Sequence, residues 1–320
     1  MAVTSAIRPQ APVLIFDIET APDVLLALDN YEPTLDFEID RSVAWRDLRI
    51  MDAINTQKKV TFPPPIFHIP ISICALYVHP ETFFLIDGFK KTVPTPSNRE
   101  ELLAGERQLL KSFWDFSTKY KDMHRTWYDK LESDIKLTEY QRRKLKPFPV
   151  TFSGYNISGF DLPVIEQRSL RHLITCPIPE YALEDGTDSY RYKYAMDRIF
   201  DLSAFFSNHQ QHCRTNLDNL ARSLGLAGKM EGMHGSKVAN EYYNNNQWER
   251  IEEYCAVDVL ITYGVFLAIQ KFRGAITGSH FKECVEHFKR FLTQEGKPPS
   301  YKALAEGSCE FFAVLERDDL

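Results

Sequence analysis

The stretch VLIFDIET (residues 13–20) joins four apolar residues to two carboxylates that flank one isoleucine. The apolar half is too short for a helix and follows Pro12, so it predicts a buried β-strand. Side chains alternate across a strand, and Asp17 and Glu19 are therefore expected on the same face. Neighbouring carboxylates repel each other and lose hydration on burial unless a cation lies between them. Two interpretations stay open here: an exposed strand end or a cation site.

The composition is that of an ordinary globular protein. The 320 residues are 44% hydrophobic and 26% charged, enough for one large domain or two small ones. The net charge of −6 excludes a surface that is basic throughout but allows a local basic groove. The first ten residues are polar and no run reaches the roughly 20 apolar residues of a membrane helix. We therefore expect a cytoplasmic protein without a membrane segment.

The six cysteines are widely spaced and include no CxxC pair, which favours free thiols in a reducing compartment. His209, His212 and Cys213 form a local cluster of metal-ligand residue types. A zinc site needs four ligands, usually as two spaced pairs, and no second pair is visible. Zinc is therefore not expected at this cluster.

The remaining pattern predicts one α/β domain with a mixed sheet. Further strands are expected at 69–78, 82–89, 149–156 and 198–206. Helices are expected at 98–120, 215–226, 248–272 and 280–293, with a shorter segment after Pro299 and a charged helical insertion at 121–147. The first two of these strands read as a hairpin beside the opening strand, and strand–helix alternation follows.

Two further motifs place acidic residues in informative positions. NISGFDLPVI (156–165) puts Asp161 at the start of a predicted helix, where the role of an N-cap is a sufficient explanation. EEYCAVDV (252–259) puts Tyr254 and Asp258 one helical turn apart on the same face. Tyr254 also fits a core stripe, whereas Asp258 lies among apolar neighbours, where a lone carboxylate is costly.

In this order, DIE on a first strand, FD after a strand with a preceding asparagine, and YxxxD on a late helix resemble the three motifs of DEDD exonucleases with a tyrosine. More closely, the chain resembles the predicted 3′–5′ exonucleases related to the exonuclease domain of family B DNA polymerases. The resemblance extends over about residues 12–272, including the segments PPPIFHIPISI, GERQLLKSF, TNLDNLARSLGLAGK, GSKVANEYY and IEEYCAVDVLITY. It implies a ribonuclease-H-like α/β fold, with a mixed sheet flanked by helices. Residues 1–275 would form the exonuclease domain, and 276–320 a C-terminal helical extension packed on it.

The resemblance also implies the catalytic residues. Asp17, Glu19 and Asp258 would hold one divalent ion. Asp17 would bridge to a second ion, which Asp161 would support directly or through water. Oxygen ligands indicate Mg²⁺ or Mn²⁺, and two such ions stabilise both the attacking and the leaving oxygen of a phosphodiester. Tyr254 would orient the attacking water.

Substrate contacts are expected close to these acids. Thr20 and Asn156 flank them and are candidates to contact the terminal sugar or base, while Phe160 fits either base stacking or the core. Lys229 lies in GLAGKMEGMHGS (225–236), which lacks the spacing of a P-loop but can bring this lysine toward substrate. The densest basic cluster fits either a phosphate-binding patch or a solvated helix face. It comprises Arg142, Arg143, Lys144 and Lys146.

The leading hypothesis is a two-metal 3′–5′ exonuclease that releases nucleoside 5′-monophosphates from single-stranded or frayed 3′ ends. DNA is favoured over RNA because the closer resemblance is to the polymerase-associated branch. Two alternatives stay open: an exoribonuclease of the same mechanism, and a nucleic-acid-binding regulatory module without catalysis. The C-terminal helices are the first place to expect an interface between copies of the chain.

Overall fold

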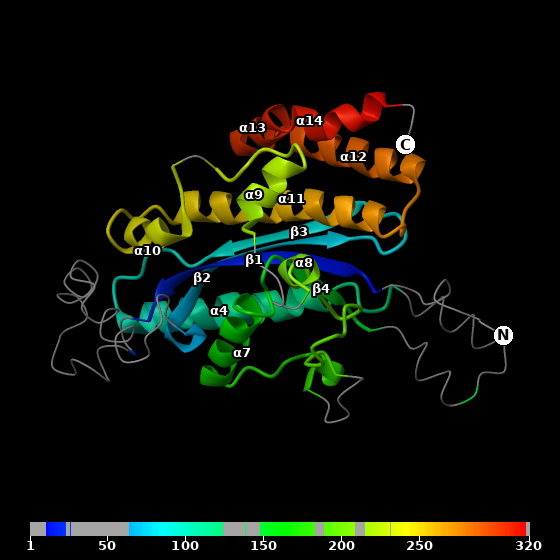
Figure 1. Ribbon diagram of the computed structural model, residues 1–320. Helices are drawn as coiled ribbons and strands as arrows, with labels where there is room; N and C mark the ends of the chain where they lie inside the picture. The colour runs from blue at the N-terminus through cyan, green and yellow to red at the C-terminus, as the bar shows by residue number, and fades with distance from the viewer. Residues whose placement is uncertain are drawn as a thin grey trace.

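The computed structural model describes residues 11–23, 64–123, 148–182, 189–208, 215–230 and 232–317, together with Leu26 and Thr138. Within them, five strands form one mixed sheet in the order β3–β2–β1–β4–β5 (Figure 1). The strands are β1 (Val13–Pro22), β2 (His68–Val78), β3 (Leu85–Thr92), β4 (Thr151–Gly154) and β5 (Ile199–Asp201). β1 pairs antiparallel with β2 and parallel with β4, so the strand that carries the first two acids is central.

Helices cover both faces of this sheet (Figure 1). They are α4 (Arg99–Ser117), α7 (Asp161–Arg171), α8 (Leu202–Phe206), α9 (Leu217–Ser223), α10 (Gly235–Tyr243), α11 (Trp248–Phe272), α12 (Gly278–Thr293), α13 (Pro299–Gly307) and α14 (Cys309–Phe312). Short 3₁₀ turns lie at Pro65–Phe67, Pro179–Ala182 and Ala313–Glu316. The expected fold class is confirmed: this is a mixed sheet flanked by helices, consistent with a ribonuclease-H-like α/β fold.

Alternate side chains of β1 enter two different cores. Val13 and Ile15 pack in the core that α11 covers, while Leu14 and Phe16 pack in the core that α4 and α7 cover. Every residue of β2 is buried, as expected for a strand inside a sheet that is covered on both faces. Because the side-chain period of a strand is two, Asp17 continues the row that faces α11.

The helix α11 is the long central helix of that face. By length and composition it could cross a membrane, with a mean hydropathy of 1.5 over its most apolar 18 residues. However, 83% of that window is buried inside the protein, as in the core helix of a soluble domain. A helix packed between a sheet and further helices is apolar nearly all round, which explains this hydropathy.

The C-terminal helices pack on the outer side of α11 (Figure 1). Phe288 of α12 meets Tyr263 of α11 edge to face, with ring centroids 5.0 Å apart, and Phe312 packs against the same phenylalanine. Residues of α12, α13 and α14 share one hydrophobic core with α11. The expected boundary near residue 275 thus lies between helices of one core.

Two expected strands have different bounds in the structure. The strand expected at 82–89 begins only at Leu85, because residues 79–84 form the turn of the hairpin and Phe83 has a φ of 56° there. The strand expected at 198–206 ends at Asp201, whose carboxylate accepts the N–H groups of Ser203 and Ala204 and so begins the helix α8. The helix α10 has no counterpart among the helices predicted from periodicity.

Three sequence predictions lie outside the described residues. They are most of the insertion at 121–147, the basic cluster Arg142, Arg143, Lys144 and Lys146, and the His209, His212 and Cys213 group. The five described cysteines are free.

Candidate active site

Three of the four predicted acids meet where β1 faces α11. One carboxylate oxygen from each of Asp17, Glu19 and Asp258 lies within 4.8 Å of the others. Glu19 and Asp258 are 7% and 1% exposed, and Asp17 is partly buried. The strand contributes two of these acids because alternate residues share a face, and α11 contributes the third because it packs across that face.

Asp161 reaches the same strand from the other side. It is the first residue of α7, but the N-cap is Phe160, and the Asp161 Oδ1 atom accepts the N–H of Ile18 at 3.2 Å. The N-cap interpretation of Asp161 is therefore wrong, because its carboxylate turns toward β1. Ile18 lies between Asp17 and Glu19, so this bond ties the start of α7 to the strand at the site. The cluster of acids within 4.8 Å does not include Asp161.

Lys229 brings a positive charge to the three acids. Its ammonium donates a hydrogen bond to Oδ2 of Asp258 and lies 3.2 Å from the hydroxyl of Tyr254. Its backbone N–H donates to Oδ1 of Asp218 at 2.7 Å, which fixes the loop after α9. Although burial opposes the charge, Asp258 and Asp17 raise the pKa of Lys229 above its ordinary value. The sequence-based expectation put this lysine near substrate, and the structure puts its ammonium on the acids.

Burial and mutual repulsion dominate the electrostatics of the site. Loss of hydration raises the pKa of Asp17 and Glu19 well above the ordinary range; neighbouring carboxylates raise both further, and Lys229 opposes this effect. Burial raises the pKa of Asp161 to about 7, although hydrogen bonds from N–H groups oppose the shift. Burial also raises the pKa of Asp258, against the effect of Lys229. One ammonium thus does not compensate these acids, and the site favours additional positive charge.

The arrangement of donors fits a divalent cation. Oδ1 of Asp258 is buried and has no hydrogen-bond partner within the described part of the chain. A buried carboxylate oxygen without a partner is costly, and a bound cation would remove that cost. Three carboxylates supply oxygen ligands, which Mg²⁺ and Mn²⁺ prefer. The residues that would hold such an ion are Asp17, Glu19 and Asp258.

Tyr254 lies in a hydrophobic core and also reaches the lysine at the acids. Its side chain is almost fully buried and packs with Ala21, Ile69 and Met233, while its hydroxyl reaches Lys229. Burial and the charge of Asp258 raise its pKa above the ordinary value, so the phenol stays protonated at neutral pH. It can therefore hydrogen-bond a water molecule but not act as a phenolate base.

His68, which the sequence analysis does not single out, contacts both Thr20 and Phe160. Nδ1 of His68 lies 2.9 Å from the Thr20 hydroxyl, and the His68 ring meets Phe160 edge to face with centroids 4.9 Å apart. His68 opens β2 opposite Pro22 of β1, so only the pairing of the strands brings it here. The three side chains lie beside the end of β1, just beyond Glu19.

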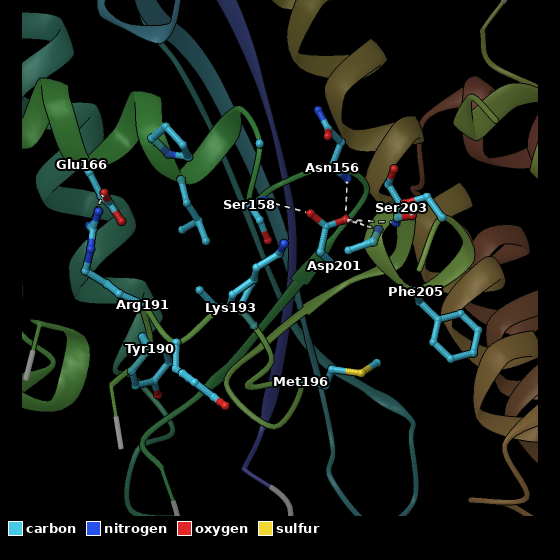
Figure 2. Close-up of a pocket in the computed structure, with 17 residues that line it drawn as sticks. Asn156, Ser158, Glu166, Tyr190, Arg191, Lys193, Met196, Asp201, Ser203 and Phe205 are labelled. Atoms are coloured by element: carbon cyan, nitrogen blue, oxygen red, sulfur yellow. Dashed lines mark hydrogen bonds and ion pairs between the residues drawn. The ribbon is translucent and has the colours of Figure 1, made fainter. Parts of the chain in front are cut away.

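Asp201 is a second residue that the sequence analysis does not single out. Its carboxylate accepts N–H groups of Asn156 at 2.9 Å and Ser158 at 3.0 Å, in addition to those at the start of α8 (Figure 2). Asn156 has a left-handed backbone with a φ of 65°. The structure therefore gives Asn156 a role in the turn between β4 and α7, the turn that leads to Asp161.

Gly159 lies close to the side chain of Asn156 within this turn. A Cβ atom at position 159 would lie 2.8 Å from Oδ1 of Asn156, so a larger residue would displace that side chain. The turn is thus built from a left-handed asparagine, a glycine and a buried carboxylate on the neighbouring strand. This turn fixes the position at which α7 begins.

The fold is consistent with the ribonuclease-H-like class, with acids on the central strand and on a helix that crosses it. The chain belongs to the family of predicted 3′–5′ exonucleases related to the exonuclease domain of PolB, whose model matches residues 138–306. Those residues include Asp161, Lys229, Tyr254 and Asp258. Asp17 and Glu19 precede them and join the same site through the sheet. Comparison with curated proteins gave no match.

The acid cluster predicts how stability depends on pH and on metal. An acid whose folded-state pKa is raised stabilises the fold while protonated, and that contribution is lost as pH rises through the folded-state pKa, about 7 for Asp161. In EDTA, the melting temperature should therefore fall between pH 5 and pH 8. Mg²⁺ or Mn²⁺ should raise it, most at pH 8, because an ion that binds only the folded state stabilises it by mass action.

Thermal unfolding from pH 5 to pH 8, with EDTA or with millimolar metal, checks this prediction. The double variant Asp17→Asn, Glu19→Gln is the control, since it should reduce the pH dependence to the part that Asp161 and Asp258 contribute and should remove the response to metal. A wild-type melting temperature that is the same with metal and with EDTA at pH 8 would contradict the metal site.

Proposed function

We propose that the protein is a two-metal 3′–5′ exonuclease that acts on single-stranded or frayed 3′ ends of DNA and releases nucleoside 5′-monophosphates. One observation carries the proposal: the carboxylates of Asp17, Glu19 and Asp258 converge, and a buried oxygen of Asp258 has no hydrogen-bond partner among the described residues. Membership of a family of predicted 3′–5′ exonucleases supports the reaction and its direction. DNA is favoured by the relation of that family to the exonuclease domain of a DNA polymerase.

The four acids would bind two ions between them. Asp17, Glu19 and Asp258 would hold the first, and Asp17 together with Asp161 would hold the second. Divalent ions bound here would compensate the buried negative charge and stabilise the charge on the attacking and leaving oxygens. The bond from the Ile18 N–H keeps the Asp161 carboxylate directed toward β1.

Tyr254 and Lys229 would complete the catalytic group. The protonated hydroxyl of Tyr254 would hold the attacking water by a hydrogen bond and so limit its orientation. The ammonium of Lys229 would keep Asp258 ionised and place positive charge beside the phosphate. The 3.2 Å contact between the two groups means that each also positions the other.

The terminal nucleotide would lie against the end of β1. The group formed by Thr20, His68 and Phe160 offers a hydroxyl, an imidazole and an aromatic ring just beyond Glu19. A base can stack on such a ring without sequence preference, and the hydroxyl can bind the sugar. Asn156 would act through the turn that it forms before Asp161.

A direct assay tests the proposal. Oligonucleotides of DNA and of RNA, labelled at the 5′ or the 3′ end, are incubated with purified protein and Mg²⁺, Mn²⁺ or EDTA. We expect 5′-labelled DNA to shorten stepwise and 3′-labelled DNA to release its label as a mononucleotide, only with metal. Faster shortening of RNA than of DNA would assign an exoribonuclease instead. The absence of metal-dependent shortening from the 3′ end of every substrate would contradict the enzyme.

Tyr254→Phe should lower kcat about tenfold to a hundredfold with little change in KM, because an unoriented water attacks less often while the acids remain. Tyr263→Phe is the matched control on the same helix, since its hydroxyl donates to the carbonyl of Phe83, at 2.7 Å. The control should keep kcat and lose about 1 kcal/mol of stability. Initial rates over a range of substrate concentration check both. A Tyr254→Phe variant with wild-type kcat would contradict the role of the phenol.

A further inference from the structure

A pocket of about 330 Å³ opens at the C-terminal ends of β4 and β5 (Figure 2). The turn before α7 forms one wall with Ser158 and Gly159, and residues 190–193 form the opposite wall. Ligands of open α/β sheets bind outside the carboxyl ends of the strands. Gly159 and Leu162 line the pocket and flank Asp161 in the sequence. The pocket thus adjoins the candidate active site and contains none of its four acids.

The wall at 190–194 has the sequence YRYKY, in which aromatic and basic residues alternate. Its first two residues anchor it. Tyr190 is buried and stacks on Tyr181 with ring centroids 5.5 Å apart. Arg191 pairs with Glu166 of α7 at 2.6 Å. The segment is therefore held against the body of the protein before any ligand binds.

The next three residues are presented to solvent. Tyr192 and Tyr194 are 40% and 57% exposed, and their rings meet edge to face with centroids 5.9 Å apart. Lys193 is exposed, and Figure 2 shows its side chain reaching into the pocket toward Ser158. Two exposed rings and a lysine therefore offer flat faces and a positive charge on one surface.

The charges leave Lys193 available for an anion. Among the residues that the structure describes, none of the carboxylates forms an ion pair with it. Asp201 is the buried acid in the pocket wall, and both its carboxylate oxygens accept backbone N–H groups, as Figure 2 shows. Glu166, the other acid of the wall, pairs with Arg191. The ammonium of Lys193 lies 5.5 Å from the centroid of the Tyr194 ring, an exposed contact that leaves its N–H donors open to a phosphate.

We infer that Tyr192, Lys193 and Tyr194 bind the single-stranded substrate on the 5′ side of the scissile phosphate, with the adjoining pocket as part of the same surface. The two rings stack on successive bases, and Lys193 contacts a backbone phosphate. Anchoring by Tyr190 and Arg191 reduces the entropy lost on binding. The inference rests on the proposed exonuclease function, since it takes the ligand to be a strand whose 3′ end lies at the acids.

Binding of 5′-fluorescein oligothymidylates of 2 to 12 nucleotides tests it by fluorescence anisotropy. The Asp17→Asn protein is the parent, so that the probe is not shortened. Tyr192→Ser combined with Tyr194→Ser should weaken 12-mer binding at least about tenfold, or about 1.4 kcal/mol, and 2-mer binding less than about twofold. Lys193→Glu should weaken 12-mer binding and lower the slope of log affinity against log salt by about one. Lys302→Glu, at an exposed lysine of α13, is the control for charge and should bind like the parent.

Circular dichroism establishes that the variants are folded, which their exposed positions favour. A 12-mer affinity of the tyrosine double variant within twofold of the parent would overturn the inference. A parent that binds no probe would overturn it as well. Hydrolysis by the wild-type protein is measured separately. If hydrolysis is absent while the tyrosine variants lose 12-mer affinity, the exonuclease proposal fails and the strand-binding surface stands.

Discussion

Replacing Asp17 by asparagine should lower kcat for hydrolysis at the 3′ end by at least about a thousandfold. Asp17 lies on the central strand with an oxygen within 4.8 Å of oxygens from two other acids, and it is the residue proposed to contact both ions. Loss of an ion removes several kcal/mol of stabilisation from the charge that develops on the phosphate, and each 1.36 kcal/mol is a factor of ten in rate. Single-turnover hydrolysis of a 5′-labelled oligonucleotide measures this loss.

The same substitution should raise the melting temperature of the metal-free protein at pH 8. Burial and neighbouring acids raise the pKa of Asp17, so its ionised form is disfavoured in the folded state. A neutral asparagine removes that repulsion. Loss of activity together with a gain in stability separates a catalytic residue from one whose loss merely unfolds the protein.

Asp87→Asn is the matched control for this experiment. Asp87 lies on β3 and pairs with Lys119 near the surface, away from the cluster of acids. Its replacement should leave kcat at the wild-type value and should not raise the melting temperature. Activity that survives in the Asp17→Asn protein would show that the acids of β1 do not form the catalytic site.

Replacing Arg168 by alanine should lower the free energy of unfolding by about 3–5 kcal/mol, because it leaves two buried carboxylates without a counter-charge. Arg168 is 1% exposed. Its guanidinium bonds both oxygens of Glu106 on α4 and one oxygen of Asp23 just after β1. His172 adds a contact to Glu106 at 2.7 Å. These buried groups join α7, α4 and the end of β1.

Urea unfolding of the wild-type and Arg168→Ala proteins at pH 7 measures this effect as a change in midpoint. Arg290→Ala is the control, since Arg290 and Glu286 form an exposed pair on α12 and should contribute less than about 0.5 kcal/mol. A loss below about 1 kcal/mol in Arg168→Ala would mean that the buried carboxylates find other compensation. The network also fixes α7 relative to β1, and with it the Asp161 carboxylate, so hydrolysis should decline in the same variant.

Much of the scaffold follows from local sequence patterns. The opening strand, the hairpin beside it and the long helix at 248–272 have strong periodic signals, and the structure has these elements at nearly the expected bounds. The same patterns place Asp17 with Glu19 on one strand face and Tyr254 with Asp258 on one helix face. Spacing of two in a strand and four in a helix is a property of the backbone alone.

Bounds were less accurate where a side chain far away in sequence or a turn decides them. The strand predicted at 198–206 is too long. It ends at Asp201, whose carboxylate caps α8 and also accepts N–H groups from a turn 43 to 45 residues earlier. The N-cap interpretation of Asp161 failed for a similar reason. Its carboxylate finds a better partner on Ile18, at a sequence separation of 143.

The sequence by itself thus determined which residues share a face of one strand or one helix. The tertiary structure decided which of these faces meet. Strand pairing brings His68 to Thr20, and the loop after α9 lays the ammonium of Lys229 on Asp258. Folding also buries the charges of Arg168, Glu106 and Asp23 in one network. Periodicity records which face of its own element a residue occupies. Proximity between elements, and the loss of hydration that makes buried acids require a cation, exist only in the packed fold.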